Sequence, residues 1–139
     1  MAVAHCQPYP RFEFGGSNLE NNSFVKRDDI RTGNSALKCV TDNADCCTRP
    51  DAGNWTDVRG EPVHQGASGT AKMYVTRSEK DGVVSLNRRT GGSSGMWRCD
   101  IPDSSGVMQS IYIYLGVSDK GTYLYEFCDV FRSVVLVYH

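Results

Sequence analysis

Short stretches in which apolar and polar side chains alternate run through the middle of the chain. Such alternation is typical of strands that turn one face toward a core. Gly, Pro, Asn and Asp residues separate these stretches, as turns require. The predicted strands are, in order, 36–41, 54–58, 72–77, 83–88, 95–101 and 107–115. Many short strands without a convincing helix between them predict an all-β sandwich.

The two ends of the chain have a different character. Residues 1–23 are rich in Pro, Gly and Asn, which predicts an irregular lead-in, although Phe12-Glu13-Phe14 alternates like a short strand that could add to a sheet edge. Residues 117–139 form a tail whose apolar positions fit a helical face or a strand, so its structure is left unassigned. We therefore expect the folded domain at residues 24–116.

Composition limits the classes of function. The chain has 139 residues, enough for one domain plus some excess, and its 16 acidic and 15 basic residues leave a net charge of −1. Nucleic-acid binding relies on clustered basic residues, which are missing here, so we expect no nucleic-acid partner. No Gly-rich phosphate loop precedes a helix, and we expect no cofactor. No window reaches the roughly 20 apolar residues of a membrane helix.

Six cysteines are the strongest compositional signal. They form no pair of CxxC motifs, and the three histidines (His5, His64 and His139) follow no ligand spacing, so we expect no metal site. A disulfide framework in an oxidising, extracellular compartment explains the cysteines better. No recognisable signal peptide begins the chain, and we favour a fragment of a longer receptor.

Two sequons agree with a secretory route: Asn21-Asn22-Ser23 and Asn54-Trp55-Thr56. If Trp55 points into a core, alternation places Asn54 outward, where a glycan can be tolerated. Asn21 lies in the polar lead-in. Both asparagines are therefore candidate glycosylation sites.

Cys39 and Cys99 lie sixty positions apart in strand-like runs, with Trp55 between them. This order, together with the sequences of residues 39–47 and 97–102, resembles the immunoglobulin-like domain of animal cell-surface receptors, of variable or intermediate type. It is also similar to such domains from early-branching animals. The resemblance covers about residues 24–116. It implies a Greek-key β-sandwich of two antiparallel sheets, a disulfide from Cys39 on strand B to Cys99 on strand F, and Trp55 and Trp97 in the core.

Three departures from that family stand out. Trp97 replaces the usual tyrosine two positions before the second cysteine, so the hydrogen bond of the tyrosine corner must be altered or absent. Ser93 stands where many members carry the aspartate of a salt bridge. The stretch from Cys39 to Trp55 is long and contains Cys46-Cys47. The pairing of Cys6, Cys46, Cys47 and Cys128 stays open, because many connectivities are allowed.

The resemblance implies a non-catalytic module that acts in cell adhesion or receptor–ligand binding through a protein ligand or a homophilic partner. A structural spacer within a larger receptor is the alternative. Tyr112 and Tyr114 alternate with isoleucines and are expected on an exposed strand face suited to protein contacts. The turn containing Asp103, Ser104 and Ser105 is expected at an end of the sandwich, where binding loops often cluster.

A third hypothesis concerns Ser93, because residues 91–95 match the letters of the G-x-S-x-G nucleophile elbow. That motif needs a helix after the serine, whereas a strand is predicted here. His139 is the only later histidine. A loop between two strands is the simpler interpretation of these residues.

Overall fold

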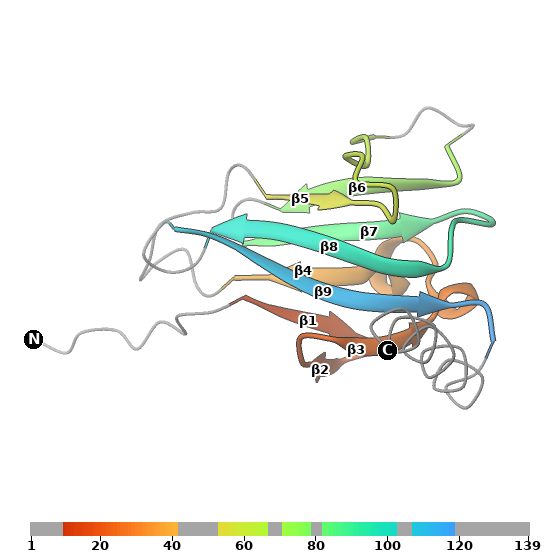
Figure 1. The fold of residues 1–139 in the computed structure, drawn as a ribbon, viewed down its shortest axis with the longest axis horizontal. Helices are drawn as coiled ribbons and strands as arrows, with labels where there is room; N and C mark the ends of the chain where they lie inside the picture. The colour runs from red at the N-terminus through yellow and green to blue at the C-terminus, as the bar shows by residue number, and fades with distance from the viewer. Residues whose placement is uncertain (1–9, 42–52, 67–70, 79–81, 103–106, 119–139) are drawn as a thin grey trace, which may run out of the picture.

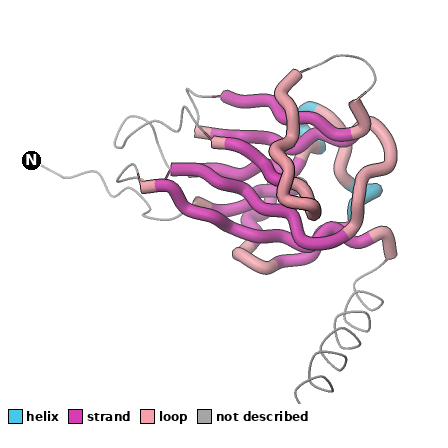
Figure 2. Tube along the Cα trace, turned by 45° about the horizontal axis from the view of Figure 1, so that its top comes forward, coloured by secondary structure: helices cyan, strands magenta, loops and turns pink. Residues whose placement is uncertain are grey.

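The computed structural model describes residues 10–41, 53–66, 71–78, 82–102 and 107–118. They form two β-sheets that pack face to face, and two views show the same two layers (Figures 1 and 2). The five-stranded sheet has the order β2 (Ser17–Leu19), β1 (Arg11–Phe14), β4 (Leu37–Val40), β7 (Val83–Arg88) and β6 (Met73–Ser78). The four-stranded sheet has the order β3 (Ser23–Lys26), β9 (Met108–Gly116), β8 (Gly95–Pro102) and β5 (Asn54–Thr56).

The six strands predicted from alternation are all present, with ends that differ by one or two residues at most. The chain places β4 in one sheet, β5 in the other, β6 and β7 back in the first, and β8 and β9 in the second. This strand order is that of an immunoglobulin-like Greek-key sandwich, which confirms the predicted fold class.

The segment around Phe12 differs from expectation. It forms β1, but this strand lies between β2 and β4 rather than at the edge. The chain folds back from β1 into β2 through Gly15 and Gly16, whose φ angles of 59° and 81° are those of a two-residue hairpin turn. Residues 11–19 are thus part of the sheet and not an irregular lead-in.

One strand pair corrects the expectation of two antiparallel sheets. β3 pairs with β9 in parallel, with Phe24 opposite Tyr114 and Val25 opposite Leu115. Two 3-10 turns, Arg27–Asp29 and Gly33–Ser35, then lead the chain from β3 across to β4 in the other sheet. The chain needs this crossing because β3 and β4 lie in different layers.

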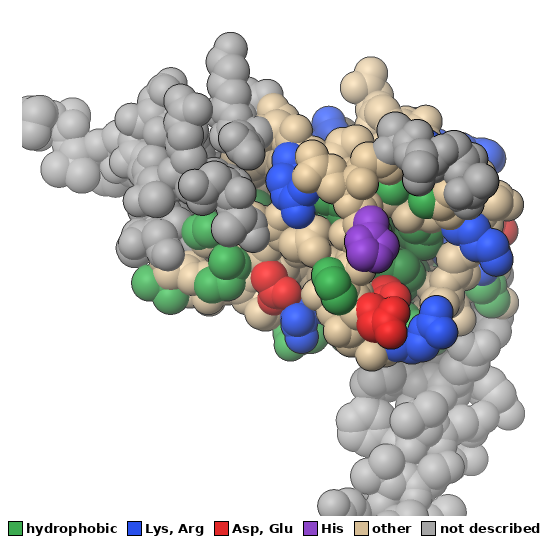
Figure 3. Space-filling view, turned by 90° about the horizontal axis from the view of Figure 1, so that it is seen from above, with side chains coloured by type: hydrophobic (Ala, Val, Ile, Leu, Met, Phe, Trp, Pro, Cys, Tyr) green, Lys and Arg blue, Asp and Glu red, His purple; other side chains and the backbone are tan. Residues whose placement is uncertain are grey.

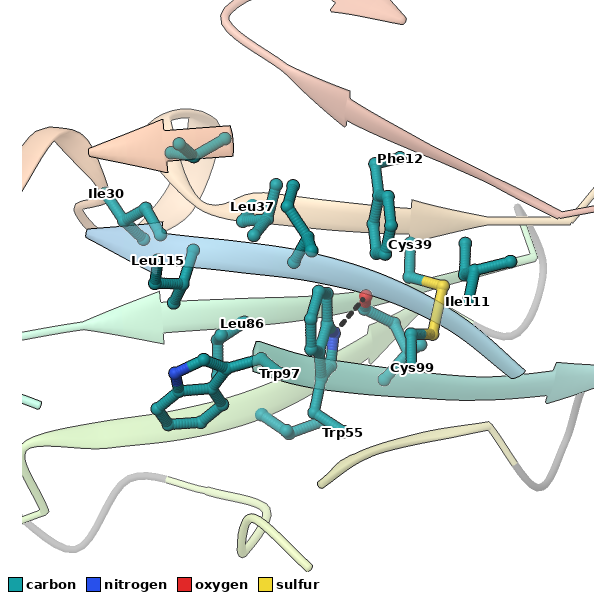
Figure 4. Close-up of a cluster of buried hydrophobic side chains, with 14 of the residues drawn as sticks. Phe12, Ile30, Leu37, Cys39, Trp55, Leu86, Trp97, Cys99, Ile111 and Leu115 are labelled. Carbon is teal, nitrogen blue, oxygen red and sulfur yellow. Dashed lines mark hydrogen bonds between the residues drawn. A yellow bond between two sulfur atoms is a disulfide. The ribbon is translucent and has the colours of Figure 1, made fainter. Parts of the chain in front are cut away.

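The core surrounds Trp55, whose side chain is fully buried (Figure 4). A disulfide joins Cys39 on β4 to Cys99 on β8 across the two sheets, with Cα atoms 6.5 Å apart. The Trp55 ring packs 5.5 Å from that of Phe12, and its Nε1 donates to the carbonyl oxygen of Val84 at 3.1 Å. The disulfide closes a loop of sixty residues, so the chain-entropy model assigns it about 4 kcal/mol of stabilisation.

Arg77 on β6 binds the edge of the opposite sheet. Its guanidinium donates to the Gly53 carbonyl oxygen (2.7 Å), to Asn54 Oδ1 (2.9 Å) and to Gln65 Oε1 (2.6 Å). The chain after β5 crosses the same gap, since Val63 N donates to Trp55 O and Val75 N donates to His64 O. We call this junction of β5, β6 and residues 61–66 the seam.

Several predicted features lie outside the described residues: the remaining part of the lead-in, the turn with Asp103, Ser104 and Ser105, the tail from residue 119, and Cys6, Cys46, Cys47 and Cys128. The domain boundary near residue 117 therefore stays a prediction, whereas residues 11–19 already belong to the sheet and lie before the boundary predicted near residue 23.

Candidate functional site

The outward side of the four-stranded sheet is the candidate site, and we call it the outer face. Side chains alternate along β8 and β9, so Trp97, Cys99, Ile111 and Ile113 enter the core while their neighbours point outward. The outward residues of the two central strands are Met96, Arg98, Asp100, Met108, Ser110, Tyr112 and Tyr114. Met96, Met108 and Tyr112 expose 41%, 49% and 38% of their surface, which is high for large apolar groups.

One half of the outer face is aromatic. Phe24 on β3 stacks on Tyr114 on β9, with ring centroids 6.2 Å apart and planes 17° from parallel. Gly116 leaves room for this stack, because a Cβ atom there would collide with the ring of Phe24. Tyr112 and Met96 continue the aromatic half across β9 and β8, since Met96 pairs with Tyr114 in the antiparallel register.

The other half is a closed polar network centred on Asp100. Its carboxylate accepts hydrogen bonds from Arg98 Nε at 3.0 Å and from Ser110 Oγ at 2.5 Å. Arg98 also donates from Nη2 to Thr56 Oγ1 on β5 at 3.3 Å. The positive and negative charges of this network compensate each other.

The start of β3 is attached to β9 at Tyr112. Asn22 N donates to the Tyr112 carbonyl oxygen at 2.7 Å, and Tyr112 N donates to Asn21 Oδ1 at 2.6 Å. Both backbone groups of Tyr112 are thereby paired on this side, which fixes the strand that carries its exposed ring.

Tyr112 and Tyr114 lie on one face of the sheet, where Tyr112 is exposed and Tyr114 is half-buried, and residues that sequence reasoning missed lie beside them. Met96, Arg98 and Asp100 were not recognised as their neighbours, although alternation from Trp97 and Cys99 already placed them outward. The position of Phe24 on this face could not be predicted from the sequence, because the alternating pattern of a four-residue strand is too short to recognise.

The loop before β8 is held through its backbone carbonyl groups. Trp97 Nε1 donates to the Ser93 carbonyl oxygen at 2.9 Å, a contact like the one that the tyrosine corner makes in immunoglobulin-like sandwiches. Arg27 Nη1 donates to the Gly92 carbonyl oxygen at 2.6 Å. Two backbone carbonyl oxygens, those of Gly92 and Ser93, therefore hold this loop.

An ion-pair cluster lies beside that loop. Arg27 donates from Nε and Nη2 to Asp28 Oδ1 at 3.0 and 2.9 Å, and Arg88 Nη1 lies 3.8 Å from the same oxygen. The hydrogen bonds from Arg27 lower the pKa of Asp28 below its ordinary value; burial opposes this, and the charges of Arg27 and Arg88 reinforce it. Arg88 is buried and also donates to the carbonyl oxygens of Ile30 and Asp28.

A cavity of about 500 Å³ opens at the seam, lined in part by Asp57, His64, Lys72, Ser93 and Trp97. Figure 3 looks onto this edge and shows acidic and basic side chains interspersed rather than gathered by sign. Asp57 Oδ1 accepts two backbone N–H bonds, from Arg59 and Glu61, and so acts as a turn former. Within the described ranges no hydrogen bond joins Ser93 to His64, so the cavity shows no assembled nucleophile and base.

The described part of the chain contains no group of three or more His, Cys, Asp or Glu side chains that could hold a metal ion. It also contains no helix with the length and apolar character needed to cross a bilayer. A comparison with family models and with curated proteins finds no match. The structure defines an immunoglobulin-like β-sandwich with a disulfide between its sheets, and the outer face is its candidate functional surface.

Proposed function

We propose that this chain is an extracellular immunoglobulin-like recognition module that binds a protein partner through the outer face of its four-stranded sheet. The observation that carries the proposal is the exposure of Tyr112 and Met96 beside the Phe24–Tyr114 stack on two long central strands. Tyr and Met are enriched at protein interfaces because they offer large contact areas, and tyrosine adds a hydroxyl group.

The rigidity of this surface supports the same function. The backbones of paired strands lose little further conformational entropy on binding, since the sheet already fixes them. The Asp100 network holds Arg98 and Ser110 in place in the same way. A partner would therefore meet a pre-organised surface with a satisfied polar half and an apolar half.

An extracellular location rests on the buried Cys39–Cys99 disulfide, because such bonds persist in oxidising compartments. Whether the domain is part of an adhesion protein or of a signalling receptor depends on the partner and not on this surface.

The test uses the secreted chain, tetramerised through a biotin tag, on an array of purified animal ectodomains that includes the chain itself. Tyr112→Ala should weaken any specific binding by about tenfold or more, as loss of an interface tyrosine usually does. Tyr74→Ala is the matched control, because Tyr74 lies on β6 with the core-facing Val75 next to it and so points outward from the opposite sheet.

Equal binding by the Tyr112→Ala and Tyr74→Ala variants would show that the outer face is not the binding surface. Failure of the tetramer to bind any ectodomain above an albumin background would reject the proposal and favour the spacer alternative.

A further inference from the structure

The sequon at Asn21 is built into the border of the outer face. Asn21 is exposed, lies between β2 and β3, and accepts through Oδ1 the hydrogen bond that Tyr112 N donates at 2.6 Å. Its neighbour Asn22 donates to the Tyr112 carbonyl oxygen at 2.7 Å. A modification at Asn21 would therefore begin beside the backbone of the most exposed tyrosine of the face.

The direction of the Asn21 carboxamide follows from this hydrogen bond. A backbone N–H can be paired only by the oxygen of the carboxamide, so Oδ1 faces Tyr112 N and Nδ2 takes no part in this bond. An N-linked glycan attaches to Nδ2 and leaves Oδ1 as an acceptor. The glycan and the hydrogen bond to Tyr112 can thus exist together.

The turn around the sequon is compatible with the folded strand as well. Asn22 has a φ of 67°, in the left-handed region that asparagine tolerates better than most residues. Ser23, the third residue of the sequon, donates from Oγ to the Glu20 carbonyl oxygen at 2.6 Å.

The second sequon lies in a different environment. Asn54 is half-buried, and its Oδ1 accepts a hydrogen bond from the Arg77 guanidinium at the seam. Thr56, which completes that sequon, exposes only 6% of its surface. Asn21 is therefore the more open of the two sites.

We infer that Asn21 carries an N-linked glycan whose first sugars screen Tyr112 and thereby set how much of the outer face a partner can reach. In the transfer, the bond between sugar C1 and the phosphate of a polyprenyl-diphosphate oligosaccharide donor breaks. A bond from C1 to Nδ2 forms, Nδ2 loses one proton, and polyprenyl diphosphate leaves. Only the consequence for partner binding rests on the proposed function.

The experiment begins with the chain secreted from animal cells and glycopeptide mass spectrometry of the Asn21 sequon. Ser23→Ala destroys the sequon while keeping Asn21, and Ser23→Thr is the matched control that keeps both the sequon and a hydroxyl group. Wild-type protein treated with a peptide-N-glycanase provides a second unglycosylated form. That treatment leaves an aspartate at position 21 that can still accept from Tyr112 N.

Hydroxyl-radical footprinting then measures the oxidation rate of Tyr112, with Tyr74 on the opposite sheet as the internal reference. Tyr112 should be oxidised about twofold more slowly in the glycosylated wild type and in Ser23→Thr than in the two unglycosylated forms, since a glycan is bulky.

An unoccupied Asn21 overturns the inference, and so does an occupied Asn21 with unchanged Tyr112 oxidation. A change seen in Ser23→Ala but not after enzymatic removal of the glycan would assign the effect to the lost hydroxyl group and would overturn it too. These readouts need no partner, so they can succeed even if the ectodomain array shows that the outer face binds nothing.

Discussion

The indole nitrogen of Trp97 donates a hydrogen bond to the backbone carbonyl oxygen of Ser93, 2.9 Å away and four residues earlier in the chain. In immunoglobulin-like sandwiches with a tyrosine corner, a tyrosine hydroxyl makes a contact of this kind. The indole reaches the loop before β8 while Trp97 exposes only 3% of its surface. One side chain thus connects the core to the loop.

Trp97→Phe should lower the free energy of unfolding by about 1 kcal/mol beyond what the smaller ring loses in packing, since it removes the donor. Urea denaturation measures this loss. Ser93→Ala is the control and should change stability by less than about 0.5 kcal/mol, because the acceptor belongs to the backbone. A Trp97→Phe variant as stable as the wild type would show that the bond contributes nothing.

The Arg27–Asp28 pair makes stability depend on pH in a defined direction. Because the folded pKa of Asp28 is lowered, its contribution is complete above the unfolded value of about 3.9 and is lost as the pH falls through the folded pKa. Asp28→Asn should therefore be less stable than the wild type at pH 7, and the difference should disappear toward pH 2.

Urea titrations between pH 7 and pH 2 measure this difference. Asp29→Asn changes the neighbouring carboxylate, for which no ion pair is found among the described residues. Its difference in unfolding free energy from the wild type should therefore depend less on pH. If the unfolding free energies of Asp28→Asn and the wild type differed by the same amount from pH 7 down to pH 2, the assigned role of Arg27 would be contradicted.

Arg77 offers a test of the seam. Arg77→Lys keeps the charge but cannot reach Gly53, Asn54 and Gln65 together, so the unfolding free energy should fall by about 1–2 kcal/mol. Hydrogen exchange should become faster at the amides of Val63, Gly66 and Val75, which make the backbone bonds across the seam.

Arg59→Lys is the matched substitution on the chain segment that leads into the seam, and it should leave these amides protected. Unchanged exchange in Arg77→Lys would mean that the backbone bonds hold the seam without the guanidinium.

The contrast between Val83–Arg88 and Ser23–Lys26 explains what the sequence could predict. The first strand has a clear alternation and strong turn signals beside it, and its predicted ends agree with the structure. The second is four residues long, contains two polar residues and pairs in parallel with a strand about ninety positions later. Local patterns cannot reveal such a pairing, since its stability comes from tertiary contacts.

The same limit applies to the candidate site. Alternation placed Tyr112 and Tyr114 outward without any knowledge of the neighbouring strands. The polar network around Asp100 depends on the register that brings Ser110 opposite it, and register is a property of the assembled sheet. The attachment of Asn21 to Tyr112 likewise joins residues 91 positions apart.

Gly116 provides a direct test of the aromatic half of the outer face. A methyl group at this position would collide with the ring of Phe24, so Gly116→Ala must displace the ring from its stack on Tyr114. We expect a loss of about 1–3 kcal/mol in unfolding free energy, as in other overpacked sites, and a change in the near-ultraviolet circular dichroism of the tyrosines. Phe24→Leu alone removes the stack but keeps an apolar side chain.

The double variant Phe24→Leu with Gly116→Ala should then be more stable than the sum of the two single losses predicts, because the smaller side chain makes room for the methyl group. A double-mutant cycle measures this coupling, which should exceed about 0.5 kcal/mol for residues in contact. Strictly additive losses of unfolding free energy would show that the backbone, and not the ring of Phe24, requires glycine at position 116. The arrangement of the aromatic half would then depend on β9 alone.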